Sequence, residues 1–234
     1  MSDRYLEFTQ SPFGKMLGLP VPPRLKRADS AWAEQPLAEK HVLVGASSGA
    51  TLAAPVLEAL HSAGAAIRVV PEHPGLAAIK PAAAELKITL TGNPAKASGD
   101  VPSYACVFDA TGLATPAQMR ELYDFFNPLI PGLPSNGRIL VLGAAPAEAA
   151  DPSRAACAAA LRGFIKSLAK ETGKKGITVN LLECAKGAGE WLAAPIRFFL
   201  SGHSAYVTGQ SLAVGDFRGD APALSGSLSG KVAL

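Results

Sequence analysis

A glycine-rich turn after an apolar run is the stretch of this sequence best suited to hold an anion. Within His41–Ala63 the letters HVLV predict a strand, Gly-Ala-Ser-Ser-Gly a tight turn, and the following apolar spacing a helix. Gly45 and Gly49 permit backbone conformations that other residues rarely adopt. The first N–H groups of such a helix point toward a phosphate above the strand end. The same pattern also occurs as plain packing of a strand and a helix.

The elements that must position this turn recur along the chain as apolar runs separated by helical segments. The runs do not alternate with polar residues, which is typical of parallel strands covered on both faces. We therefore expect a doubly wound, Rossmann-like α/β fold of about seven strands, with ligands at their carboxyl ends. The expected strands are His41–Val44, Ala65–Val70, Leu86–Leu90, Tyr104–Phe108, Arg138–Leu142, Ile177–Leu182 and Ser211–Val214. Further helices are expected at Thr115–Leu129, Ser153–Thr172 and Glu190–Leu200, and none between the third and fourth strands.

Composition argues against several other classes of function. A net charge of +3 without a cluster of basic and aromatic residues does not favour nucleic acid. The sequence lacks both an apolar run of about twenty residues and a secretory signal, so we expect no membrane contact and a cytoplasmic location. Three cysteines without CxxC spacing and four scattered histidines predict buried thiols and no metal site.

Five motifs in order resemble the short-chain dehydrogenase/reductase family. They are VGASSGAT, VFDATG, GRILVLG, GFIKSLAKETGKKGITVNLL and AYVTGQSLAV. The lead-in SPFGKMLGLPVPPRL and the final LSGKVAL look most like the N-terminal half of long, two-domain 3-oxoacyl-acyl-carrier-protein reductases. This resemblance implies a lead-in or strap at 1–40, a Rossmann-like domain at 41–220, and at 221–234 a linker with the start of a second reductase domain. Within the lead-in, one or two short amphipathic turns are expected before the prolines at 20, 22 and 23.

Members of that family reduce ketones with a Tyr, a Lys four residues later and a Ser. The resemblance places the Tyr position at Arg154, the Lys position at Ala158 and the Ser position at Ala144, or Gly143 if the gap shifts by one. Arginine cannot deliver a proton and alanine has no polar side chain. We therefore predict no catalytic residues of the usual kind in this chain. The loop after the sixth expected strand is also too short for the usual substrate lid.

The expected cofactor site is partly retained. The candidate cofactor-binding residues are Gly45, Ser47, Ser48, Gly49 and Asp109. Thr51, however, stands where the resemblance places a third glycine, and its branched side chain would crowd a cofactor. The acid that the resemblance expects at the ribose is replaced by Val70-Pro71. The Asp expected near the adenine is replaced by Thr91-Gly92-Asn93-Pro94, and the usual Asn of the fourth strand is replaced by Asp109.

The first hypothesis is thus a non-catalytic domain that binds no cofactor firmly, within a parent protein that uses NAD(P)H to reduce 3-oxoacyl thioesters in fatty-acid synthesis. Its role would be structural, oligomeric or regulatory. Its partners would be its own C-terminal reductase domain and a second copy, through the helices at Ser153–Thr172 and Thr115–Leu129. Two alternatives remain open. One is an active oxidoreductase with Arg154, Asp109 or Glu183 as a non-standard acid, and the other is a domain that binds nucleotide without turnover.

Overall fold

Apolar strands build the centre of this protein. The computed structural model describes residues 4–19, 32–92 and 102–215, and within these ranges seven parallel strands form one sheet in the order β3-β2-β1-β4-β5-β6-β7. The strands are β1 His41–Ala46, β2 Ala66–Val69, β3 Thr91–Gly92, β4 Ala105–Asp109, β5 Arg138–Ala144, β6 Thr178–Cys184 and β7 Ser211–Val214. Every residue of β4 and β6 is buried, because helices cover both faces of the sheet. The doubly wound parallel fold predicted from the apolar runs is confirmed.

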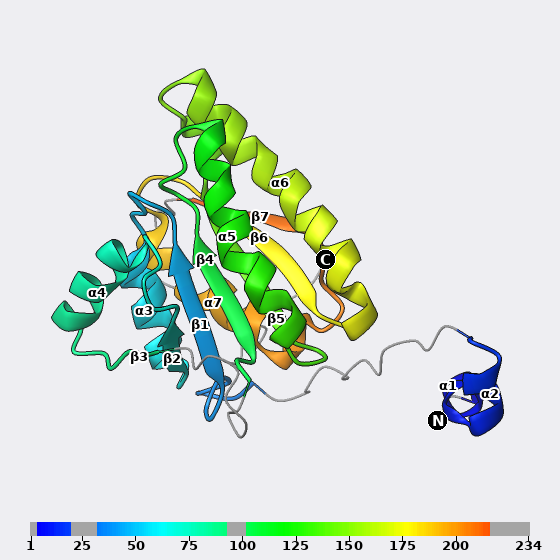
Figure 1. Cartoon of the computed structure of the whole chain (residues 1–234). Helices are drawn as coiled ribbons and strands as arrows, with labels where there is room; N and C mark the ends of the chain where they lie inside the picture. The colour runs from blue at the N-terminus through cyan, green and yellow to red at the C-terminus, as the bar shows by residue number, and fades with distance from the viewer. Residues whose placement is uncertain (1–3, 20–31, 93–101, 216–234) are drawn as a thin grey trace, which may run out of the picture.

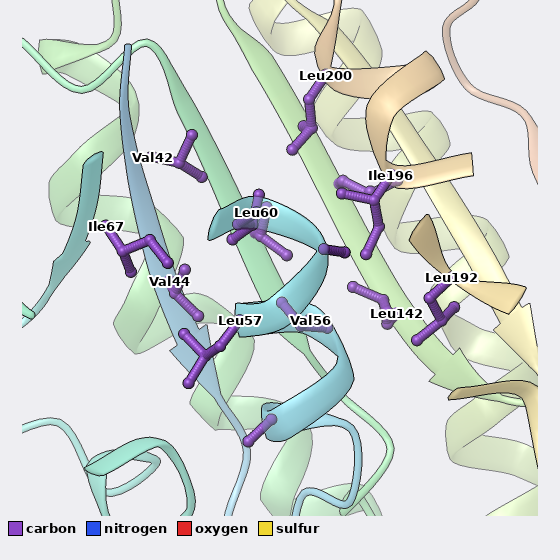
Figure 2. Packing of buried hydrophobic residues seen from close by; sticks show 14 of the residues in the cluster. Val42, Val44, Val56, Leu57, Leu60, Ile67, Leu142, Leu192, Ile196 and Leu200 are labelled. Carbon is purple, nitrogen blue, oxygen red and sulfur yellow. The ribbon is translucent and has the colours of Figure 1, made fainter. Parts of the chain in front are cut away.

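Helices on the two faces create two separate cores (Figure 1). One face is covered by α3 (Ala53–Ser62), α4 (Leu76–Glu85) and α7 (Ala193–Leu200). The other is covered by α5 (Arg120–Leu129) and α6 (Pro152–Thr172). Side chains alternate along a strand, so Val42 and Val44 of β1 join the first core while Leu43 joins the second. Figure 2 shows the first core, where side chains of α3 and α7 gather against β1 and β5.

The second core is rich in aromatic side chains. Phe108 of β4 lies 4.9 Å from Phe125 of α5, between ring centroids, and 5.8 Å from Phe126. Phe125 packs directly onto the backbone of β1 at Gly45, where an added Cβ would lie 2.2 Å from the ring. Gly45 is therefore required by the packing of α5 on the strand.

The third strand was predicted in the wrong place. The sequence predicted Leu86–Leu90, whereas the strand is the two-residue β3, which pairs through Arg68–Thr91 and Val69–Gly92. Helix α4 runs to Glu85, and Lys87 then adopts a left-handed conformation with a φ of 55°. The apolar side chains of Ile88 and Leu90 pack against the first core from a loop instead of a strand.

Two predicted helices begin later than expected. The segment predicted as Thr115–Leu129 starts with a 3-10 turn at Pro116–Met119 before α5. The segment predicted as Glu190–Leu200 follows a 3-10 turn at Ala188–Trp191 and becomes α7 only at Ala193. The predicted helix at Ser153–Thr172 is α6 almost to the residue, because Asp151 caps its N-terminus by accepting a hydrogen bond from the Arg154 N–H.

Short helical turns, which the sequence predicted for the lead-in, are present where the structure describes it. Its short amphipathic turns are α1 (Arg4–Gln10) and α2 (Pro12–Met16), and Ser11 caps α2. Leu37 is fully buried, and its N–H donates to the carbonyl of Ala63 at 2.9 Å, so residues near 37 pack on the domain. The expectations for the prolines at 20, 22 and 23, for the missing helix within 93–101 and for residues 221–234 lie outside the described residues.

Candidate functional site

The turn between β1 and α3 lies at the carboxyl edge of the sheet, as expected. Gly49 has a φ of 77°, and an added Cβ would meet open space, so glycine is needed there for its conformation alone. The Ser47 side chain is buried, with its hydroxyl donating to the carbonyl of Asp109 at 3.0 Å and accepting from the N–H of Gly112 at 3.1 Å. Ser47 thus joins the turn to the end of β4, and its hydroxyl is fully engaged within the chain.

Asp109 lies beside this turn because β4 pairs with β1 in a register that places Asp109 opposite Ala46. Its carboxylate is only 2% exposed and points at the start of α3, where Oδ2 accepts from the N–H of Leu52 at 2.7 Å. The other oxygen, Oδ1, accepts from the N–H and the hydroxyl of Thr111, at 3.0 and 2.6 Å. Burial raises the pKa of Asp109, while its hydrogen bonds to Thr111 and Leu52 oppose that shift.

Two further side chains accept from the amides of the same turn, and the sequence did not single them out. Glu121, in the first turn of α5, accepts from the N–H of Ser48 at 2.7 Å. The hydroxyl of Thr111 accepts from the N–H of Thr51 at 3.0 Å. Three N–H groups of the turn that leads into α3, those of residues 48, 51 and 52, therefore bind oxygens of the chain itself.

The connection between β2 and α4 crosses the end of β1. At Gly75 an added Cβ would lie 1.9 Å from the carbonyl oxygen of Ala46, so the two backbones are in close contact. The N–H of Gly75 donates to Nδ1 of His73, whose ring lies edge-on to Phe108 and Phe125 at 6.0 and 5.4 Å. Burial lowers the pKa of His73, and the carboxylates of Glu121 and Asp124 oppose that shift. This segment closes the edge of the sheet on the β2 side of the glycine turn.

A pocket of about 300 Å³ opens on the other side of the turn, at the ends of β4, β5 and β6. Ala144, Arg154 and Ala158, the three positions that the resemblance matched to Ser, Tyr and Lys, all line it. The structure thus brings these three positions together. Arg154 is exposed, and its Nε lies 3.5 Å from the carboxylate of Asp151. Most of the remaining lining is apolar, from Leu52, Leu113, Ala145, Ala149 and Cys184.

The other groups that could move a proton are held elsewhere or at the rim. Glu183 is buried on β6 and forms a bidentate ion pair with Arg162, including Nη2 to Oε2 at 2.7 Å, and it does not line the pocket. Burial raises the pKa of the Cys184 thiol to about 12. Glu148 and Lys186 lie at the exposed rim, where the Glu148 carboxylate accepts from the backbone N–H of Lys186 at 2.7 Å.

Cysteines 106, 157 and 184 are free and buried, as the sequence predicted. Across residues 4–19, 32–92 and 102–215, no group of three or more His, Cys, Asp or Glu side chains is arranged to hold a metal ion. In the same ranges no helix has the length and apolar character needed to cross a membrane.

Comparison with known proteins gives structural neighbours only. No family model and no curated protein sequence matches the chain. A short-chain dehydrogenase/reductase from Serratia marcescens superposes with a TM-score of 0.58 and 19% identity, over 77% of this chain and 98% of its own. A dehydrogenase/reductase from Sinorhizobium meliloti gives 0.59 and 18%, over 78% and 96%. A blue fluorescent protein from a metagenomic library, in complex with NADPH, gives 0.57 and 20%, over 77% and 98%.

Because the sequence identities to these neighbours are only 18–20%, the structural similarity shows a shared fold. It spans almost the full length of these neighbours and rests on the seven-stranded parallel sheet. The chain has the Rossmann-like fold of the short-chain dehydrogenase/reductases.

Proposed function

We propose that this chain is a non-catalytic domain with a short-chain reductase fold, which supports or regulates a catalytic domain that reduces 3-oxoacyl thioesters with NAD(P)H. The observation that carries this proposal is the pocket in which Ala144, Arg154 and Ala158 meet. In the resemblance these positions supply the hydroxyl that holds the ketone, the proton donor and the cation that tunes it. Here they supply two methyl groups and one guanidinium.

Ketone reduction requires a proton for the developing alkoxide as the hydride arrives. The Arg154 guanidinium does not release a proton near neutral pH, and a Cys184 thiol with a pKa of about 12 is a poor donor to that oxygen. Glu148 and Lys186 lie exposed at the rim, and the Glu148 carboxylate is occupied by the backbone N–H of Lys186. Asp109 and Glu183, the other acids considered from the sequence, are bound within the chain. These arrangements favour the non-catalytic hypothesis over an active oxidoreductase with an unusual acid.

An association role is supported by the outer surface of α5 and α6. A groove of about 340 Å³ lies between them, lined mainly by Met119, Leu122, Tyr123, Phe126, Ile130 and Phe164. The ring of Tyr123 is 54% exposed. On α6, Ala159 and Gly163 are exposed, and an added Cβ at Gly163 would meet open space, so another helix could approach closely. We propose that a second copy or the reductase domain of the same protein covers this surface.

Activity tests this proposal directly. The purified chain is mixed with acetoacetyl thioester and either NADH or NADPH, and oxidation of the cofactor is followed by absorbance, with an active short-chain reductase as the positive control. We expect a rate equal to that without protein. Cofactor oxidation that depends on both the chain and the thioester would refute the proposal. Titration of the chain with NADPH alone separates the remaining alternative, a domain that binds nucleotide without turnover.

A further inference from the structure

We propose that the carboxylates of Glu121 and Asp109 occupy the anion seat formed by the glycine turn that leads into α3, so that this seat holds an internal anion where the fold would otherwise place a dinucleotide pyrophosphate. The inference rests on the proposed function in one respect, since it explains why the chain would bind no cofactor firmly. It concerns binding, however, and is tested without any measurement of turnover.

Hydrogen bonds to the turn carry the first step. A phosphate at a helix N-terminus is bound by backbone N–H groups that have no partner within the helix. Here the N–H of Ser48 donates to Glu121 and that of Leu52 to Asp109, both at 2.7 Å. That length is typical of bonds to an ionised acceptor. A pyrophosphate would have to break these bonds before it could use the same donors.

Helix α3 also offers fewer donors than a usual phosphate-binding helix. Pro55 is the third residue of α3 and has no N–H to donate. The N–H of Thr51 is bound to the Thr111 hydroxyl, which in turn donates to Asp109, so this amide is tied to the same carboxylate. The donors that remain free for an external anion are therefore reduced on two independent grounds.

Close backbone contacts around the glycine turn also oppose the binding of a pyrophosphate. Gly112 packs against the turn so closely that an added Cβ would lie 2.3 Å from the carbonyl oxygen of Ser48. On the β2 side, the contact of Gly75 with Ala46 closes the strand end over which an adenosine would extend. A pyrophosphate between these two contacts would meet the side-chain oxygens of Glu121 and Asp109, which already accept the N–H groups of Ser48 and Leu52. The described residues therefore do not fit a dinucleotide in the usual orientation.

The two acids differ in how firmly they are held. Asp109 is buried on a central strand and is fixed by three donors. Glu121 is only half-buried and reaches the turn from α5, with a single bond to Ser48. The carboxylates of Glu121 and Asp124 both act on the pKa of His73. Glu121 is thus the part of the internal anion that can be removed with least effect on the fold.

Binding by the Glu121→Ala variant tests the inference, with Asp124→Asn as the matched control. Asp124 lies on the same helix and forms an exposed ion pair with Arg120. Inorganic pyrophosphate and NADPH are titrated by calorimetry up to about 1 mM, the upper end of common Michaelis constants. We expect the original chain and Asp124→Asn to show no NADPH binding and to bind pyrophosphate with a Kd of about 1 mM or weaker. Glu121→Ala should bind pyrophosphate about tenfold more tightly than the original chain, the ratio for one exchanged charge-assisted hydrogen bond.

A second readout does not depend on ligand binding. Because the Ser48 N–H donates to Glu121, the Ser48 amide proton should exchange with solvent more slowly in the original chain than in Glu121→Ala, as measured by NMR. Micromolar binding of NADPH by the original chain, or an unchanged pyrophosphate affinity in folded Glu121→Ala, would overturn the inference. So would a Ser48 amide proton that exchanges equally fast in the original chain and in Glu121→Ala. Turnover by the original chain would instead refute the proposed function.

Discussion

Asp109→Ala is expected to destabilise the domain, because it removes the acceptor for the start of α3. The carboxylate accepts three hydrogen bonds and is 2% exposed. All three bonds are part-buried, so water can replace some of them but not all. Leaving one such donor without a partner costs about 1–3 kcal/mol. We expect a loss of that size in the free energy of unfolding at pH 7, measured by urea denaturation with circular dichroism.

The matched variant is Asp109→Asn, which keeps the shape and one acceptor oxygen but does not titrate. Since burial raises the pKa of Asp109 in the folded state, its contribution to stability is present below the unfolded pKa and is lost as pH rises through the folded pKa. From about pH 4 upward, the original chain should therefore lose stability relative to Asp109→Asn. The reasoning fails if Asp109→Ala lies within about 0.5 kcal/mol of the original chain, or if the gap to Asp109→Asn moves in the opposite direction with pH.

Three further predictions concern packing, thiols and association. Gly45→Ala should lower the free energy of unfolding by about 1–3 kcal/mol, because its methyl group would collide with the ring of Phe125. Gly163→Ala, on open helix surface, should raise the free energy of unfolding by about 0.5–1 kcal/mol. Thermal unfolding measures both variants. Cys184, with a pKa of about 12, should be about one part in ten thousand thiolate at pH 8, so iodoacetamide should label it only after denaturation, as mass spectrometry can show. Tyr123→Glu, in the groove between α5 and α6, should weaken self-association in sedimentation.

Each of these three predictions would be contradicted by a specific result. Equal melting temperatures for the two glycine variants would contradict the packing described at Gly45. Labelling of Cys184 in the folded chain within minutes would show that the pocket exposes a reactive thiolate. A chain that sediments as a monomer, and gains no stability from a covalently linked reductase domain, would argue against the proposed use of the groove around Tyr123.

The fold was predictable because its strands are continuous apolar runs that only a covered parallel sheet can bury. The strand at the edge was not predictable in position, since β3 is defined by its pairing with Arg68 and Val69 and not by its own residues. Ile88 and Leu90 are apolar enough to suggest a strand, yet the left-handed residue Lys87 turns the chain before them. Tertiary packing, not local preference, decides this edge.

The site was predictable only where its residues are close in sequence. The glycine turn and the Asp109 motif are each visible as short patterns. Glu121 is separated from Ser48 by 73 residues, and an acid in the first turn of a helix is common for its favourable interaction with the helix dipole. Its contact with the turn depends on how α5 packs over Gly45, which the sequence alone does not specify.

Hydride transfer itself provides the most direct test of the account. The chain is incubated overnight with NADPH deuterated at the transferred position and acetoacetyl thioester, and the hydroxyacyl product is sought by mass spectrometry. Because Ala144, Arg154 and Ala158 supply no proton donor at the pocket, we predict no deuterated product above the level without protein. Deuterium at the carbinol carbon, formed in proportion to the amount of chain, would contradict that claim.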